Sequence, residues 1–306
     1  SVGGLMVRGS PEEQAAAVAR ALELGINLFD TAAAYGDGTS ETNLGRVLRE
    51  LSAEVVLATK VRLSPDAQSL KAATVTAVEA SLNRLGRSYV DLIQIHNRIA
   101  PSRATWPQAL TPEQVLGPGG VLEGFEALRR EGKVRFFGFS GLGEPSAIHH
   151  LVDSGRFHTV QVYYNLLNPS AAYPVPPTFS AQDYQRLMDR ASAEGMGVAA
   201  IRVLAAGALS TTPEAGGGSR SSTPLSLGSE YARDVERTRG LGFLVRDDIH
   251  RTSQAALRFA LMNPAASTAL LGFSTPQQID EAAACAGAGP LPERALEQLH
   301  HLWETL

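Results

Sequence analysis

GINLFDTAAAYGDGTSETNLG, residues 25–45, contains in one stretch the two kinds of segment that alternate along this chain. Its apolar run INLF ends at Asp30 and is typical of a short buried strand. Tyr35 follows across a short loop, and Glu41 and Asn43 stand where the next helix is expected to begin. The stretch predicts a strand, a loop and a helix, with an acid and a phenol near the point where the strand ends.

The alternation of strand and helix continues along the whole chain. Seven short apolar runs predict strands, at 26–30, 54–60, 89–96, 133–140, 158–165, 195–202 and 267–273. GGLM at 3–6 would make eight, and whether residues are missing before Ser1 stays open. Continuous apolar strands separated by helical spacing imply a parallel sheet covered on both faces. The pattern predicts an α/β fold, a (β/α)8 TIM barrel that occupies residues 1–306 as a single domain.

Two long irregular segments interrupt the pattern, at 97–118 and 211–229. Each follows a strand, where a barrel places its active-site loops, and loops of this length are usually either functional or disordered. We interpret both as lids over a substrate or cofactor, and surface decoration is the alternative. LPERALEQLHHLWETL at 291–306 predicts an added amphipathic helix at the C-terminus.

The composition narrows the class of protein. With 44% hydrophobic and 19% charged residues, the chain has enough apolar material for a buried core. A net charge of -4, without a dense Lys/Arg cluster, argues against a nucleic acid or a membrane surface as partner and favours a small molecule. A single cysteine, Cys285, rules out a disulfide within the chain, and we expect a cytoplasmic protein without a membrane anchor.

Polar residues end four of the expected strands. Asp30, Lys60, His96 and Ser140 each close an apolar run, and Tyr35 lies five residues beyond Asp30. Taken singly, each has a structural explanation, such as an acid that caps a turn or a lysine that extends into solvent. In a barrel, however, the carboxyl ends of the strands surround one active-site mouth. We therefore expect these side chains to converge.

The combination of acid, lysine, phenol and imidazole has a coherent chemistry. A phenol has an unperturbed pKa near 10 and is a poor proton donor at pH 7, but a neighbouring ammonium stabilises its phenolate. Lys60 is placed to do this with Asp30 as its ion-pair partner, while Tyr35 protonates a carbonyl oxygen as hydride reaches the carbon. A neutral His96 would orient the same oxygen. This chemistry needs no metal, and no HExxH or CxxC spacing occurs, so we expect no metal. We expect no flavin either.

At this point residues 25–45 resemble the aldo-keto reductase segment that carries a catalytic aspartate and tyrosine. Further matches follow in the family's order: VDLIQIH at 90–96, GFSG at 138–141, VQVYYN at 160–165 and LLGFSTPQQIDEA at 270–282. The resemblance spans essentially the whole chain. Within the family, the chain is similar to the bacterial, aldose dehydrogenase-like branch. It implies an oxidoreductase that uses NADP or NAD to interconvert carbonyls and alcohols or lactols.

The resemblance also implies roles for individual residues. Asp30, Tyr35, Lys60 and His96 form the catalytic tetrad. Ser140 and Gln161 are expected to hold the nicotinamide carboxamide. The expected contacts to the adenosine phosphate and ribose are Gly272, Phe273, Ser274, Thr275, Gln278 and Glu281.

Four positions depart from the family's pattern. Gly141 replaces an asparagine that commonly helps to hold the carboxamide. Ile201 stands where an aromatic ring commonly stacks on the nicotinamide, so apolar packing is expected there instead. Arg202 is a candidate for the cofactor pyrophosphate or an acidic substrate, with a structural salt bridge equally open. Gln278 replaces a basic residue that NADPH-preferring members often carry, which predicts weakened discrimination in favour of NADPH unless Arg220 or another lid residue substitutes.

Two other classes of protein match parts of the sequence pattern. GLGEPS at 141–146 partly matches the G-x-G-x-x-G dinucleotide fingerprint, but Ser146 replaces its third glycine, which argues against a Rossmann dehydrogenase. A nicotinamide-binding regulatory or sensor subunit with little turnover stays open, although the complete tetrad favours an enzyme. The pattern fits carbonyl compounds and sugars alike as substrates, and the oligomeric state stays open. Trp106 and Tyr164 are candidate substrate walls.

Overall fold

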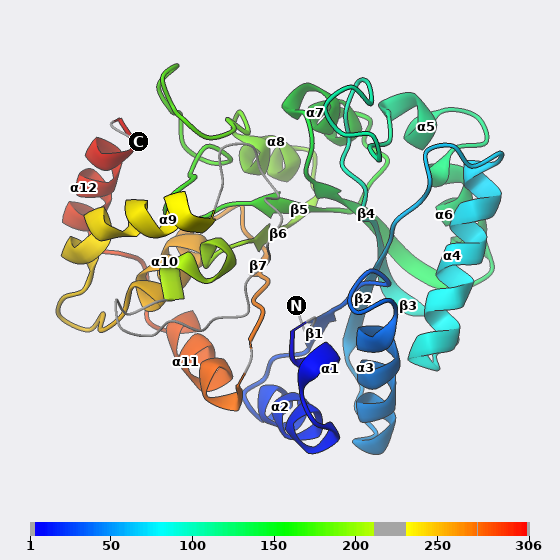
Figure 1. Cartoon of the computed structure of the whole chain (residues 1–306), viewed down its shortest axis with the longest axis horizontal. Helices are drawn as coiled ribbons and strands as arrows, with labels where there is room; N and C mark the ends of the chain where they lie inside the picture. Colours follow the sequence, from blue (N-terminus) through cyan, green and yellow to red (C-terminus); the bar gives the residue numbers. More distant parts are fainter. Residues whose placement is uncertain (1–3, 211–230, 274, 305–306) are drawn as a thin grey trace. The chain divides into compact units, whose positions relative to one another are not determined.

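The computed structural model describes residues 4–210, 231–273 and 275–304 (Figure 1). They divide into two compact units. The first comprises Ser1–Gln161, Glu194–Met196 and Gly272–Asp280, and the second comprises Val162–Ala193, Gly197–Leu271 and Glu281–Leu306.

The strands of the described residues form one sheet of seven, hydrogen-bonded to one another in sequential order. Those of the first unit are β1 (Leu28–Asp30), β2 (Val56–Val61), β3 (Val90–Ile95) and β4 (Val134–Gly141). They pair in parallel. β5 (Thr159–Tyr163) follows, and β6 (Gly197–Ile201) pairs in parallel with β7 (Thr268–Ala269) in the second unit. The parallel α/β architecture agrees with the sequence prediction, and all seven apolar runs contain a strand.

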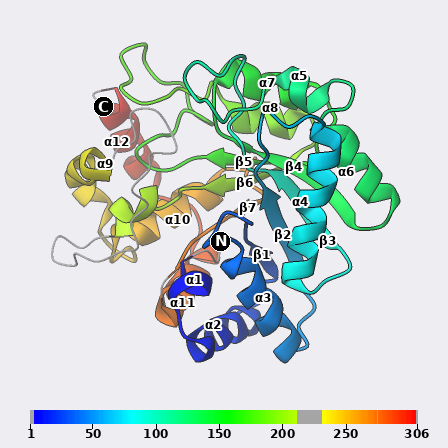
Figure 2. The ribbon, with the colours of Figure 1, turned by 45° about the vertical axis from the view of Figure 1, so that its right-hand side comes forward.

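Helices of the first unit cover the outer side of its strands. They are α1 (Leu5–Arg8), α2 (Pro11–Glu23), α3 (Thr39–Glu50), α4 (Leu70–Leu85), α5 (Pro112–Leu116), α6 (Val121–Arg130) and α7 (Pro145–Asp153). α4 lies beside both α3 and α6 and packs on β2, as Figures 1 and 2 show. A Cβ added at Gly45 of α3 would lie 2.2 Å from the Leu85 carbonyl oxygen. Glycine at that position therefore allows α3 to approach the end of α4.

The second unit contains the remaining helices. They are α8 (Leu187–Ala193), α9 (Tyr231–Thr238), α10 (Thr252–Met262) and α12 (Glu293–Trp303), with 3-10 turns η1 (Ala205–Ser210) and η2 (Arg239–Leu244). α11 (Pro276–Ala286) has residues in both units. The indole nitrogen of Trp303 donates to the Leu166 carbonyl oxygen at 2.8 Å, and its ring packs on Phe259. Trp303 thereby anchors α12 in an aromatic core.

The prediction of an eighth strand at GGLM is wrong for the residues that the structure describes. Leu5–Arg8 form the helical turn α1, in which Leu5 and Met6 are buried. The Gln14 side chain donates to the carbonyl oxygens of Leu5, Met6 and Gly9, and Asn43 donates to that of Met6. The Leu5 carbonyl also accepts from the Gly9 amide, whereas Gln14 and Asn43 supply donors to the carbonyl groups that follow it at the end of this short helix. An apolar run of this length does not distinguish strand from helix, and the partners that decide it come from α2 and α3.

The structure describes one of the two segments expected to be lids, residues 97–118. Within 97–118, Ile99 forms isolated bridges with Leu110 and Gly143, and α5 occupies part of the segment. It is thus a folded segment, and its action as a lid stays a prediction. Residues 211–229, with Arg220, lie outside the described residues. Among the helices described, none is long and apolar enough to cross a membrane.

Candidate active site

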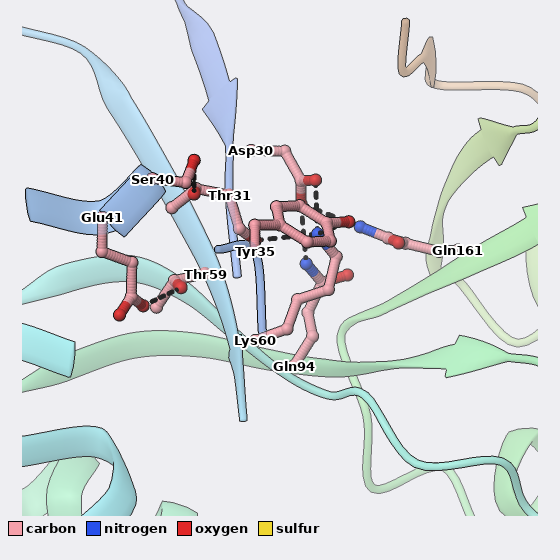
Figure 3. Close-up of polar contacts among 9 residues, drawn as sticks. All are labelled: Asp30, Thr31, Tyr35, Ser40, Glu41, Thr59, Lys60, Gln94 and Gln161. Atoms are coloured by element: carbon pink, nitrogen blue, oxygen red, sulfur yellow. Dashed lines mark hydrogen bonds and ion pairs between the residues drawn. The ribbon is translucent and has the colours of Figure 1, made fainter. Parts of the chain in front are cut away.

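Side chains from the carboxyl ends of adjacent strands converge in the first unit (Figure 3). Asp30 is the last residue of β1, Lys60 lies near the end of β2, and His96 directly follows β3. Because these strands are parallel neighbours, their carboxyl ends lie at one edge of the sheet. Tyr35, from the loop after β1, contacts both Lys60 and His96. The structure therefore brings these four residues together, as the sequence predicted.

Lys60 is the centre of this cluster. Its side chain is only 1% exposed, and its ammonium nitrogen lies 2.5 Å from Asp30 Oδ2, 2.8 Å from the Thr31 carbonyl oxygen and 3.4 Å from the Tyr35 hydroxyl. Burial acts to lower the pKa of Lys60, but the charge of Asp30 and the interaction with Tyr35 outweigh it and leave the pKa raised. An ammonium has three N–H donors. All three have an acceptor here, one of which is the phenol.

Tyr35 is half-buried in the loop between β1 and α3. Gly36, Asp37 and Gly38 all have positive φ angles, of 61°, 50° and 86°, and they turn the chain sharply into α3. A Cβ added at Gly38 would lie 2.6 Å from Cδ of Arg84, so a side chain there would also clash. This turn places the phenol over Lys60, with the ammonium 5.1 Å from the ring centroid.

His96 completes the tetrad. Its ring meets that of Tyr35 edge to face, with centroids 5.7 Å apart. Burial and the positive charges of Lys60 and Arg62 lower the pKa of His96 to about 3. The imidazole is therefore neutral at pH 7, and one of its nitrogens carries an N–H that can donate a hydrogen bond.

Two amides complete the surroundings of Asp30. Oδ1 of this carboxylate accepts from Gln161 Nε2 at 2.9 Å and from Gln94 Nε2 at 3.2 Å, while Oδ2 contacts Lys60. All four side chains are buried. Gln161 was predicted from the sequence, whereas Gln94 was not. The available signal was a polar residue inside the otherwise apolar run DLIQI.

A second buried network lies next to the tetrad (Figure 3). Thr31 and Ser40 hydroxyl oxygens are 2.8 Å apart, and the Thr59 hydroxyl donates to Glu41 Oε1 at 2.5 Å. Glu41 also pairs through Oε2 with Nε of Arg84 at 2.7 Å. Thr31 and Thr59 are chain neighbours of Asp30 and Lys60. The first turn of α3 is thus hydrogen-bonded to β2 and to the residue that follows β1, beside the Asp30–Lys60 ion pair. Glu41 therefore does more than begin the helix, which was the role expected for it.

The predicted nicotinamide contacts of the first unit have hydrogen-bonding capacity to spare. Ser140 near the end of β4 and Gln161 in β5 are both buried. Within the described part of the chain, neither the Ser140 hydroxyl nor Oε1 of Gln161 has a hydrogen-bond partner. A hydroxyl and an amide oxygen suit a carboxamide, which both donates and accepts hydrogen bonds.

The expected adenosine contacts lie around the start of α11. Gly272, Thr275 and Gln278 are exposed, and Phe273 is half-buried. Ser274 lies outside the described residues. The other expected cofactor and substrate residues belong to the second unit or to the long segment after β3.

Glu281 and Arg202 occupy constrained positions in the second unit. Glu281 forms an ion pair with Arg251, at 3.2 Å between Oε1 and Nη1. Ile201 ends β6, and its carbonyl oxygen accepts from the Tyr164 amide. Arg202 follows with a φ of 57°, and its carbonyl oxygen accepts from the Asn165 side chain. A left-handed non-glycine residue at a strand end is held by its surroundings and is common at functional sites.

The two aromatic substrate candidates differ in exposure. Trp106 is half-buried, with the Arg98 guanidinium 5.6 Å from its ring centroid. Tyr164 is fully buried and stacks on Phe259 at 4.8 Å between centroids, and burial raises its pKa. The placement of Tyr164 is that of a packing residue, and we do not include it in the proposed substrate site. Within the described residues, no group of three or more His, Cys, Asp or Glu could hold a metal ion.

Comparison with known proteins identifies the class to which this fold and site belong. The sequence model of the Aldo/keto reductase family matches residues 2–304. The chain belongs to this family.

Individual relatives span most of the chain. A putative voltage-gated potassium channel subunit beta of Schizosaccharomyces pombe is 30% identical over 92% of this chain and 82% of its own length. The holo form of aldo-keto reductase AKR11C1 from Bacillus halodurans superposes with a TM-score of 0.71 at 23% identity, covering 99% of this chain and 91% of that one. An aldo-keto reductase from Klebsiella pneumoniae in complex with NADPH has a TM-score of 0.68 at 22% identity, covering 99% and 88%. The solved structures show that the fold is shared.

Proposed function

We propose that this protein is an NAD(P)-dependent oxidoreductase that interconverts carbonyls and alcohols or lactols, with Tyr35 as general acid and base. The observation that carries the proposal is the Lys60 ammonium, which is fixed by Asp30 and lies 3.4 Å from the Tyr35 hydroxyl. A lysine that serves only an ion pair has no need of a half-exposed phenol as its third acceptor. Membership of the Aldo/keto reductase family supports the same chemistry.

In the direction of reduction, Tyr35 donates its proton to the carbonyl oxygen. Lys60 stabilises the phenolate that remains, because its ammonium is held against the phenol by Asp30 and the Thr31 carbonyl. Neutral His96 donates a hydrogen bond to the same oxygen and orients it. A bound nicotinamide supplies the hydride in this direction and accepts it in the reverse one. In the reverse reaction the Tyr35 phenolate takes the proton from the alcohol.

Ser140 and Gln161 would hold the carboxamide of that nicotinamide. Support comes from their burial and from the unpaired Ser140 hydroxyl and Gln161 Oε1 within the described residues. The Klebsiella pneumoniae relative in complex with NADPH is consistent with a nicotinamide cofactor. On this proposal the seven strands of the described residues belong to a (β/α)8 barrel.

We expect the protein to have only a weak preference for NADPH over NADH. Gln278 is exposed at the start of α11 and has no positive charge to recognise a 2′-phosphate. We therefore expect kcat/KM values for NADPH and NADH that differ by less than about a hundredfold, or roughly 2.7 kcal/mol. Gln278→Arg is the matched variant and should raise the preference for NADPH. A larger preference for NADPH in the wild type would contradict this part of the proposal.

A nicotinamide-binding regulatory subunit is the second candidate. The observation that favours it is the relative named as a putative potassium channel subunit beta. Both candidates need the cofactor site, but only the enzyme needs a proton donor with a lysine partner. The complete tetrad therefore places the enzyme first.

A substrate panel separates the two candidates. Aldehydes, ketones and aldoses are assayed with both cofactors in both directions, and bound cofactor is measured separately by fluorescence. The enzyme proposal expects turnover of at least one class of carbonyl. Tight cofactor binding with no turnover of any substrate would favour the regulatory subunit. Trp106→Ala then tests the substrate wall, because it should raise KM for bulky substrates more than for small ones.

A further inference from the structure

Gln94 is a buried polar residue in the middle of an apolar strand. It lies in β3, is 1% exposed and is the register partner of Lys60 on β2. In parallel strands, register partners place their side chains on the same face of the sheet. Gln94 and Lys60 both reach Asp30 on that face, as Figure 3 shows.

The two oxygens of Asp30 have separate partners. Among the residues that the structure describes, Oδ2 contacts only the ammonium of Lys60, whereas Oδ1 accepts from the amides of Gln94 and Gln161. An amide nitrogen can only donate, so it satisfies a carboxylate in its ionised form. Because one oxygen is held by amides, rotation of the carboxylate away from Lys60 would break hydrogen bonds in a buried site.

The two amides differ in what else they do. Gln161 is expected to use Oε1 for the nicotinamide, so its contact with Asp30 shares one side chain with the cofactor. Within the described residues, the Gln94 side chain makes one hydrogen bond, to Asp30, and contacts no expected cofactor group. Its hold on Asp30 therefore does not depend on cofactor.

We propose that Gln94 is a positioning residue of the catalytic site. Its amide fixes Asp30 so that Oδ2 stays on Lys60, and Lys60 in turn keeps its third N–H on Tyr35. The inference rests on the proposed function for its effect on turnover, but the arrangement of Asp30, Lys60 and Tyr35 is testable without turnover.

The effect of removing the amide has a definite sign. Without Gln94, the negative charge of Asp30 is less compensated, and a phenolate at Tyr35 forms close to that charge. Deprotonation of Tyr35 then needs a higher pH. Within the described residues, the other charged or titratable groups around the site are Lys60, His96 and Arg62, with the Glu41–Arg84 ion pair in the adjoining network. His96 is neutral across this range because its pKa is about 3.

The test compares Gln94→Met, Gln94→Glu and Gln161→Met with the wild type. Gln94→Met keeps the length of the side chain and removes the donor. It should lower kcat about 10- to 100-fold, the range for one lost hydrogen bond to a charged group, and leave the Kd of the nicotinamide unchanged. Gln161→Met should weaken cofactor binding as well. Gln14→Met, which removes a buried amide from the α1–α2 contact, is the matched control and should alter stability alone.

A second readout needs no substrate. Ultraviolet difference titration of the cofactor-free protein, with Tyr35→Phe subtracted, follows the Tyr35 phenolate. Its midpoint should move up by about 0.5 to 1 pH unit in Gln94→Met and further in Gln94→Glu, which adds a carboxylate beside Asp30.

The two readouts separate the possible failures. A wild type without turnover would refute the proposed function, while the titration would still test Gln94. If a folded Gln94→Met protein has the phenolate midpoint and kcat of the wild type, the positioning role is overturned. A fall in kcat equal to that of Gln14→Met, with no shift of midpoint, would overturn it equally.

Discussion

Lys60 shows how far single residues could be predicted from the sequence. A polar residue at the end of an apolar strand indicated the site, and the structure brings Lys60 together with Asp30, Tyr35 and His96. Strand ends are predictable because parallel strands share one edge. Gln94 was not predicted, because a glutamine within a strand has no fixed partner until the neighbouring strands are in register.

His96 gives a pH dependence of stability with a clear sign. Its pKa falls from 6.5 to about 3 in the folded protein, so below pH 6.5 the unfolded chain binds a proton that the folded protein does not. Stability from this group is therefore lost as pH falls from 6.5 towards 3. We expect the wild type to lose about 2 kcal/mol more than His96→Gln between pH 6.5 and 4.5.

Urea unfolding of both proteins at the two pH values measures that difference. An equal loss of unfolding free energy in wild type and His96→Gln would show that the folded imidazole takes up a proton normally. It would also remove the argument for a neutral hydrogen-bond donor at this position.

At the scale of elements, α3 and its loop determine where Tyr35 lies. The helix was predicted from residues 25–45, but the contacts that hold it in place were not. Glu41 accepts a hydrogen bond from Thr59 on β2 and forms an ion pair with Arg84 on α4. Those partners lie 18 and 43 residues away in sequence. The failed strand at GGLM has the same cause, since Gln14 and Asn43 hold α1 through contacts between elements.

Arg84→Met tests this fastening. Glu41 is fully buried, so removal of its cationic partner leaves an uncompensated charge, while the one-third exposure of Arg84 limits the loss. We expect a decrease of about 2 kcal/mol in the free energy of unfolding. Glu41→Gln in the same protein should recover part of it.

The surface pair Arg239–Glu236 supplies the control, because both side chains are largely exposed. Arg239→Met should cost less than about 0.5 kcal/mol. Equal losses in Arg84→Met and Arg239→Met, measured by urea unfolding, would mean that Glu41 is not held as described.

At the scale of the whole molecule, the tetrad and the predicted carboxamide contacts all belong to the first unit. Ile201, Arg202 and Glu281 belong to the second. The order of strands and helices was predictable from hydrophobic periodicity, which is why seven strands were found where expected. Long-range pairing was not, because periodicity contains no information on which distant side chains meet.

Cofactor binding should stabilise the whole protein even without substrate. A nicotinamide dinucleotide whose free concentration is a hundred times its Kd adds about 2.7 kcal/mol to the free energy of unfolding. For a chain of this length we expect a rise in Tm of about 5 °C. Calorimetry with NADP and with NAD measures it, and AMP serves as a control without a nicotinamide. A Tm unchanged by either dinucleotide would contradict the cofactor assignment.

The most direct test of the central claim is the turnover of an aldehyde by Tyr35→Phe. This variant removes one oxygen atom, leaves Asp30 and Lys60 in place and should bind cofactor as the wild type does. We predict a loss of kcat of at least about 100-fold, as expected for removal of a general acid. A Tyr35→Phe protein that turns over at the rate of the wild type would show that Tyr35 is not the proton donor.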